Sequence, residues 1–122
     1  MENNLEKKIN IILDEYVEEL GEDIDDICEQ IAGEAVTELK ATSPRSDKAT
    51  RHYADGWTHR KEGEHGRVVY NKSKPSLTYL LNNGHQIANQ YGRYERYDGD
   101  GHIDRVEEKA NVKIVKEVEK RL

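Results

Sequence analysis

Apolar residues recur at helical spacing through the first forty positions, and this pattern constrains the fold more than any other feature. It predicts two amphipathic stretches, residues 5–20 and 24–39. One straight helix over both would rotate its apolar stripe by roughly 160°, so they cannot bury one common face. Gly21 lies at the join, and we expect a kink or break near residues 20–23, or an apolar stripe that passes from one partner to another. The apolar positions are Leu5, Ile9, Ile12, Tyr16 and Leu20, then Ile24, Ile27, Ile31, Ala35 and Leu39.

The middle of the chain carries the signals of a loop followed by a β-hairpin. Ser43 precedes Pro44 and ends the helical region, because a residue before proline is disfavoured in the α conformation. The polar run 41–52 then predicts a loop. Trp57 and the later run RVVYN are typical of strands, and the glycine-containing EGEHG between them predicts the turn of a hairpin over residues 53–71.

Two further helices are predicted. Residues 74–84 place three leucines on one face, and Gly84 is a helix stop. A helix this short is not stable alone in water, so we expect its leucines to pack against the sheet or the long helix. Asp104 with Glu107 three residues later resembles a capping box ahead of an amphipathic helix over residues 103–121. The three leucines are Leu77, Leu80 and Leu81.

These segments predict a single α+β domain over residues 1–122. A long N-terminal helix, kinked or broken, and a C-terminal helix pack on a small antiparallel β-sheet, with a short helix after the hairpin. In chain order, the segments are a helical region (4–40), a loop (41–52), a β-hairpin (53–71), a short helix (74–84), a loop or arm (85–101) and a C-terminal helix (103–121).

Composition leaves material for only a thin core. Of the 122 residues, 34% are hydrophobic and 36% are charged, and the aromatic residues are seven Tyr and one Trp, without Phe. Rings with a polar end suit half-buried and intersubunit positions, so we expect self-association.

Cys28 is the only cysteine, which excludes an internal disulfide and fits a reducing cytoplasm. The chain has no apolar run of the length that a membrane helix or signal peptide requires.

Charge is segregated along the chain. Residues 1–40 hold 13 acids and 3 bases (net −10), residues 41–97 hold 5 acids and 10 bases (net +5), and residues 98–122 hold 7 acids and 6 bases (net −1), which sum to −6. The acidic end and the basic middle could attract each other within a subunit or between copies. The alternative is that these charges form solvated helix faces.

Neither a metal site nor a catalytic centre is predicted. No two of the five histidines have the i, i+4 spacing of a helical zinc site, and none is flanked by acids at a familiar ligand interval. Cys28 lies at a core position of a helix, and Asp25 and Asp26 belong to a carboxylate-rich helix face. We therefore expect no enzyme activity, metal or cofactor. The histidines are His52, His59, His65, His85 and His102.

A nucleic-acid surface is a weaker possibility. Basic residues between positions 45 and 74 are interleaved with Tyr53, Trp57 and Tyr70, which could contact phosphates and stack on bases. The overall pI near 5.4 opposes this interpretation, and the same aromatic pattern suits a packed hairpin.

The order of the short motifs is also informative. An acidic helix ending in TSP is followed by a Gly-Trp strand, then VVYN, then LTYLLNNGH, and finally Gly-His-Ile before a closing helix. From about residue 5 to its end, the chain resembles the small tail-completion, or head-tail joining, proteins of tailed bacteriophages and prophages, which are minor tail or neck components. The residues that carry the resemblance, and that are the candidates for packing or assembly, are Ser43, Pro44, Gly56, Trp57, Val69, Tyr70, Asn71, Leu77, Leu80, Leu81, Gly84, His85, His102 and Ile103.

The resemblance implies a structural α+β subunit without catalysis, located in the tail or neck of the virion and in the host cytoplasm during assembly. Related proteins are thought to form a ring, with six copies expected, which joins the tail tube to the connector below the capsid. The implied partners are further copies of the chain and the neighbouring tail-tube and connector proteins, with no membrane. DNA would pass without specific binding. From the net charge of −10 over residues 1–40 alone, we hypothesise that the acidic helix lines or flanks the DNA channel of such a ring.

Two other functions remain open. The main alternative is a small acidic protein-binding or regulatory module that recognises one partner through its helices. A nucleic-acid-processing enzyme comes third, because no set of carboxylates and histidines converges in the sequence.

Overall fold

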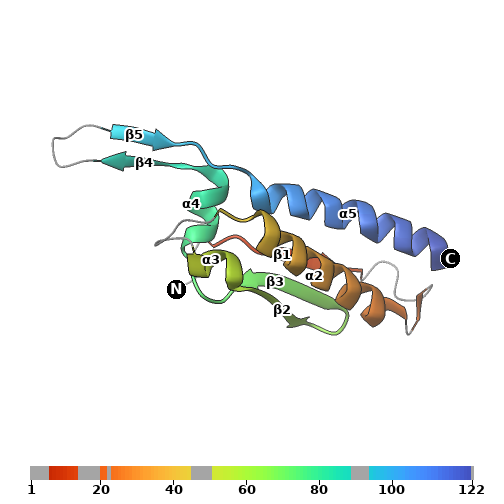
Figure 1. Ribbon diagram of the computed structural model, residues 1–122. Helices are drawn as coiled ribbons and strands as arrows, with labels where there is room; N and C mark the ends of the chain where they lie inside the picture. The colour runs from red at the N-terminus through yellow and green to blue at the C-terminus, as the bar shows by residue number, and fades with distance from the viewer. Residues whose placement is uncertain (1–5, 14–19, 22, 45–50, 89–93, 122) are drawn as a thin grey trace.

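The computed structural model describes residues 6–13, 20–21, 23–44, 51–88 and 94–121 (Figure 1). The fold is α+β, as predicted, with two long helices packed on a three-stranded antiparallel sheet and a short helix after the hairpin. The elements are β1 (Ile9–Ile12), α2 (Asp23–Thr42), α3 (Arg51–Asp55), β2 (Trp57–Glu62), β3 (Gly66–Asn71), α4 (Leu77–Asn83), β4 (His85–Ala88), β5 (Tyr94–Tyr97) and α5 (His102–Arg121).

The three-stranded sheet has the order β1-β3-β2, with β3 in the centre. Ile9 lies opposite Val69 in the ladder of β1 with β3. Because alternate side chains of a strand share a face, Ile9, Val69 and Trp57 all lie on the core side of the sheet, where each is buried. On the opposite face, the guanidinium carbon of Arg60 lies 4.9 Å from the centre of the Tyr70 ring. The sheet thus has one apolar core face and one mixed face, where Asn10, Thr58 and Arg60 lie beside Val68 and Tyr70.

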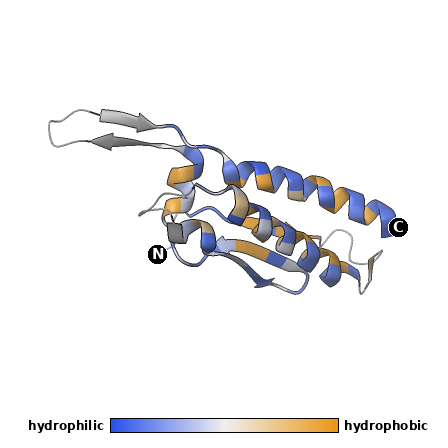
Figure 2. Cartoon of the chain, in the orientation of Figure 1, coloured by the Kyte–Doolittle hydropathy of each residue, from blue (hydrophilic) through white to orange (hydrophobic). Residues whose placement is uncertain are grey.

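Both long helices cover the apolar face. Helix α2 lies mainly against β3 and β2, and α5 packs beside α2 and also contacts β1. Figure 2 shows hydrophobic positions interspersed with hydrophilic ones along both helices, as expected for helices with one buried side. The buried core residues are Ile9, Ile11, Leu13, Leu20, Ile24, Ile27, Cys28, Ile31, Ala32, Ala35, Leu39, Tyr53, Trp57, Val69, Ile103, Val106, Ala110 and Val118.

Ion pairs join α2 to α5 along their length. Lys109 contacts Glu38, and Nζ of Lys113 lies 3.2 Å from a carboxylate oxygen of Glu34. Near the other end of the pair, Arg121 lies 3.4 Å from Asp23, so the two helices are antiparallel. The acids of α2 therefore pair mainly with the last helix. An ion pair between the described residues of α2 and of the basic middle of the chain joins Glu29 to Arg67 over 4.0 Å.

The first amphipathic stretch is not helical over residues 6–13, whereas Leu20 at its end is in a helical conformation. Residues 9–12 form strand β1, and Ile9 and Ile11 are buried while Asn10 and Ile12 are exposed. The sequence alone does not distinguish this period-two pattern from a helix, because Ile9 and Ile12 also fit a helical spacing. Residues 14–19, the rest of that predicted helix, lie outside the described part of the chain.

The predicted break at Gly21 is present. Its φ of 55° lies in the left-handed region that favours glycine, and the long helix α2 begins at Asp23. The same helix ends at Thr42, directly before Ser43 and Pro44, as the sequence predicts.

Three other boundaries differ from the prediction. Residues 51–55, which the sequence assigns to a loop and a strand, form helix α3. The region 85–101, predicted as a loop or arm, contains the paired strands β4 and β5. Helix α4 begins at Leu77, later than predicted, because Pro75 and Ser76 form a turn before it.

Candidate functional site: the base of a projecting hairpin

Strands β4 and β5 form a two-stranded hairpin that projects from the body of the molecule (Figure 1). His85 pairs with Tyr97 next to the body, and Ala88 pairs with Tyr94 further out. Beyond their mutual ladder, the two strands make no more than marginal contact with any other helix or strand that the structure describes. We call β4 and β5 the arm, and the residues where it joins the body the arm base.

Glycine makes the close approach at the arm base possible. Gly84 ends α4 with a φ of 90°, and its N–H donates to the carbonyl oxygen of Leu80 over 2.8 Å. A Cβ atom on Gly99 would overlap the backbone carbonyl of Asn82 and would lie 2.5 Å from the backbone nitrogen of Gly84. The chain that leaves the arm therefore presses directly on the chain that enters it.

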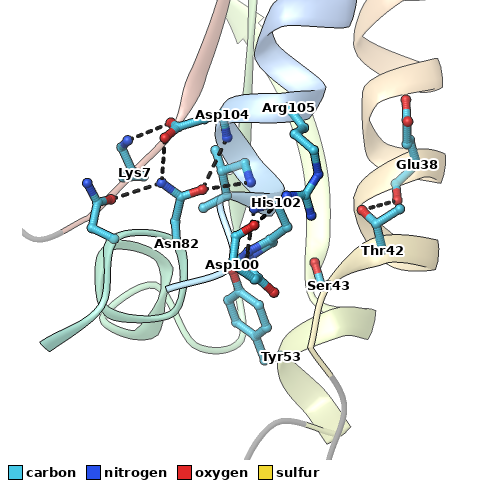
Figure 3. Close-up of polar contacts among 12 residues, drawn as sticks. Lys7, Glu38, Thr42, Ser43, Tyr53, Asn82, Asp100, His102, Asp104 and Arg105 are labelled. Atoms are coloured by element: carbon cyan, nitrogen blue, oxygen red, sulfur yellow. Dashed lines mark hydrogen bonds and ion pairs between the residues drawn. The ribbon is translucent and has the colours of Figure 1, made fainter. Parts of the chain in front are cut away.

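Asn82 links the end of α4 to the start of α5 (Figure 3). Its side-chain oxygen accepts hydrogen bonds from the backbone N–H groups of Ile103, at 2.8 Å, and of Asp104, at 3.1 Å. These are two of the N–H groups that have no partner within a helix at its first turn. Asn82 thus caps α5 from a different helix, and the asparagine itself is buried.

Asp104 connects the arm base to the start of β1. One of its oxygens accepts from the Asn82 amide at 3.0 Å, and the other accepts from Nζ of Lys7 at 2.8 Å. The hydrogen bond from Lys7 lowers the pKa of Asp104, and the bond from Asn82 adds to this effect. The backbone N–H of Lys7 in turn donates to the hydroxyl of Thr78 in α4 over 2.7 Å. Strand β1, α4 and α5 are therefore bonded together at one point.

His102 connects the arm base to the core. Its ring is fully buried, with Nε2 2.6 Å from the Tyr53 hydroxyl and Nδ1 2.5 Å from a carboxylate oxygen of Asp100. The carboxylate fixes the imidazole proton on Nδ1, so Nε2 can accept from the tyrosine. Burial lowers the pKa of His102, although Asp100 opposes this effect. Neutral His102 therefore serves as a structural link between α3 and the arm base.

A second polar cluster lies behind Tyr53. Nδ2 of Asn71 donates to the backbone carbonyl of Tyr53 over 2.7 Å, and Oδ1 of Asn71 accepts from the backbone N–H of Lys74 over 2.8 Å. The indole N–H of Trp57 donates to the hydroxyl of Ser43 over 2.8 Å, and both residues are buried. Three separate segments, the end of α2, residues 53–57 and residues 71–74, are thus joined around α3.

The structure brings half of the sequence-predicted residues into these two clusters. Ser43, Trp57 and Asn71 meet around α3. Gly56 lies in the same cluster, where a Cβ atom would be only 2.6 Å from Oδ1 of Asn71. Gly84, His102 and Ile103 lie at the arm base, whereas Val69 is in the core and Tyr70 is on the outer face of the sheet. Pro44 follows α2, and His85 begins β4, although its side chain lies outside what the structure describes.

The leucines of α4 are placed differently from the prediction. Leu77 and Leu81 are partly buried against the core, but the buried side chains of this helix are Thr78 and Asn82. Leu80 is also only partly buried and is not part of the core cluster. The helix packs chiefly on α5, rather than on the sheet or α2, because polar bonds to the start of α5 fix its position.

The predicted capping box at Asp104 is wrong. Helix α5 begins at His102, and Asp104 lies in its first turn. Asp100 accepts from the backbone N–H of His102 over 3.0 Å, and Asn82 accepts from the next two N–H groups. Sequence analysis considers Tyr53 only as a possible base-stacking ring, and it does not single out Thr78, Asn82, Gly99 and Asp100. Of these, Asp100 alone has a local signal, as an acid two residues before a helix.

Among the residues that the structure describes, no three His, Cys, Asp or Glu side chains gather in a way that could hold a metal ion. Tyr53 and Trp57 are buried, so they cannot stack on bases as the nucleic-acid hypothesis requires. Of the helices described, none has the length and apolar content needed to cross a bilayer.

Comparison with known proteins identifies no relative of this chain. The chain shows no significant match to any protein-family model, to any curated protein or to any solved structure. The functional argument therefore depends on the arm and on the order of motifs in the sequence.

Proposed function

We propose that the protein is a structural component of a tailed phage or prophage particle, which completes the tail and joins it to the head connector as a ring of copies. The sequence supports this through its resemblance to tail-completion proteins. Many of the residues that carry the resemblance, among them Gly84, His102 and Ile103, lie at the arm base or in the cluster around α3. Three of the residues that carry the resemblance, Gly84, His102 and Ile103, thus take part in holding the arm.

The observation that carries the proposal is the arm itself. An isolated two-stranded hairpin is at best marginally stable in water. The backbone of this hairpin projects away from the described helices and strands of the body, yet its base is fixed by buried hydrogen bonds and close glycine packing. A hairpin that is held at its base and projects from the body is suited to be completed by a neighbour, which is the role of a joining subunit.

The proposal extends to partners and location. The ring contacts the tail tube on one side and the connector on the other, in the virion and in the host cytoplasm during assembly, with no catalytic step. The acidic α2 would lie near the DNA channel, where like charge reduces sticking of the duplex. Its acids already pair partly with lysines of α5, which limits the charge that is available for this purpose.

Particle analysis tests this function. Mass spectrometry of particles produced by the genetic element that encodes the chain should find the chain in a small, fixed copy number. Deleting its gene should leave filled heads and tails unjoined in electron micrographs, and restoring the wild-type gene should rejoin them. Absence of the chain from the particles, or normal joined particles after the deletion, would contradict the proposal.

A further inference from the structure

Strand β1 is an edge strand with an uncharged sequence. It pairs with β3 on one side, and in the described part of the chain no strand and no other backbone hydrogen bond engages Ile9–Ile12. Its sequence is INII, whereas the other edge strand, β2, ends in Arg60, Lys61 and Glu62. Charged residues on an edge oppose pairing with another chain, and an uncharged apolar edge favours it. Of the two edges, β1 is the one suited to accept a strand.

Two exposed apolar side chains flank this edge. Ile12 on β1 is 51% exposed and Val115 on α5 is 54% exposed. Ile12 and Val115 lie equally far along β1 and α5. Lys7 near the start of β1 contacts Asp104 near the start of α5, and both elements run in the same direction (Figure 1). From Lys7 to Ile12 an extended chain advances about 17 Å, and from Asp104 to Val115 a helix also advances about 17 Å.

Val115 also lies on the side of α5 that faces β1. It follows Asp104 by eleven residues, which turns the helix by three full turns plus roughly 20°. The two residues therefore share one stripe, and Asp104 shows that this stripe faces the start of β1. Val112, which is 49% exposed, lies roughly 80° around the helix from that stripe. We call the open edge of Ile9–Ile12, flanked by Ile12 and Val115, the β1 slot.

We propose that the β1 slot of one copy binds the arm of a second copy by adding the arm to the edge of the three-stranded sheet. The lengths match, because β1, β4 and β5 each have four residues. The arm needs a further strand or packing surface, and the slot offers backbone partners with an apolar residue on either side. Figure 1 shows the arm extending away from its own body, so it does not serve its own slot.

Each copy then gives one arm and accepts one arm. Such a contact is head to tail, and it produces a ring where the rotation closes and a filament where it does not. This inference rests on the proposed ring and names the surface through which its copies join.

Paired variants of the full chain test the contact. In Val115→Lys the slot carries a charge where an apolar contact is expected, and Val112→Lys is the matched control on the same helix. An arm-deleted chain, with residues 86–96 replaced by a short Gly-Ser linker, retains the slot. Light scattering over a concentration series should show self-association of the wild type and Val112→Lys, weakened at least tenfold in Val115→Lys and in the arm-deleted chain.

Mixing distinguishes a head-to-tail contact from any other. Val115→Lys retains an arm and the arm-deleted chain retains a slot, so an equal mixture should form 1:1 dimers, whereas each alone is monomeric. If the arm-deleted chain does not fold, Ala88→Pro replaces it, because proline removes a backbone donor from β4. The proposal would be overturned if the arm-deleted chain self-associated as strongly as the wild type. It would also be overturned if Val115→Lys and Val112→Lys changed self-association equally. A wild type that remains monomeric would also overturn it, while joined particles that depend on the gene would still support the proposed function.

Discussion

Replacing Asn82 by alanine tests whether the arm base is held by the buried cap of α5. The substitution removes the acceptor of two backbone N–H groups, those of Ile103 and Asp104. Loss of a helix cap typically costs about 1 kcal/mol. Ile103 is buried, so its N–H has little access to water, and a buried unsatisfied donor adds about 1–2 kcal/mol. Asp104 is exposed and water can replace its acceptor. The expected loss is about 2–3 kcal/mol.

Urea denaturation followed by circular dichroism measures this loss. The matched control is Asn111→Ala, the same substitution at an exposed position of α5, which should change the free energy of unfolding by less than about 0.5 kcal/mol. Asn82→Ala should lower the transition midpoint without a large change of slope. If both variants unfold within about 0.5 kcal/mol of the wild type, Asn82 does not hold the start of α5 and the account of the arm base is wrong.

Three further predictions use the same denaturation assay. Gly99→Ala should lower the free energy of unfolding by about 2 kcal/mol or more, because its Cβ meets backbone atoms. The control, Gly33→Ala in α2, places a Cβ where nothing lies within 4 Å and should raise the free energy of unfolding by about 0.5–1 kcal/mol. If both variants change the free energy of unfolding in the same direction, the close packing of Gly99 is refuted. Ser43→Ala leaves the buried indole N–H of Trp57 without its acceptor and should lower the free energy of unfolding by about 1–2 kcal/mol. An unchanged denaturation midpoint would contradict this prediction. Burial lowers the pKa of His102 below its unfolded value near 6.5, so its contribution is complete above pH 6.5 and is lost as the pH falls through the folded pKa. The stability lost between pH 7.5 and pH 5.5 should therefore be smaller in His102→Gln than in the wild type, and an equal loss would exclude His102 as the cause.

The sequence predicts the elements whose signals are local. Helix α2 begins after the glycine break and ends before Ser43 and Pro44, because backbone preferences at these positions act within a few residues. Gly84 ends α4 for the same reason. By contrast, Ile9 and Ile12 fit both a helix and a strand, and only the pairing of β1 with β3, nearly sixty residues later, decides for the strand.

The arm base was less accessible to prediction because its bonds are long-range. Asn82 caps a helix that starts twenty residues later, and no local pattern marks an asparagine for that role. Asp104 and Glu107 have the spacing of a capping box, but the cap is already occupied by Asn82 and Asp100. The bond of Tyr53 to His102 likewise joins residues forty-nine positions apart. Sequence motifs thus indicated the region, and tertiary packing assigned the roles.

The central claim is that the arm is completed by a neighbour in the assembled state. Hydrogen–deuterium exchange of the backbone amides of residues 85–88 and 94–97 tests it most directly, when the dilute isolated chain is compared with the assembled particle. The account predicts fast exchange of these amides in the isolated chain and slow exchange after assembly, while amides of α2 remain slow in both. Slow arm exchange in the isolated chain, or fast exchange in both states, would contradict it.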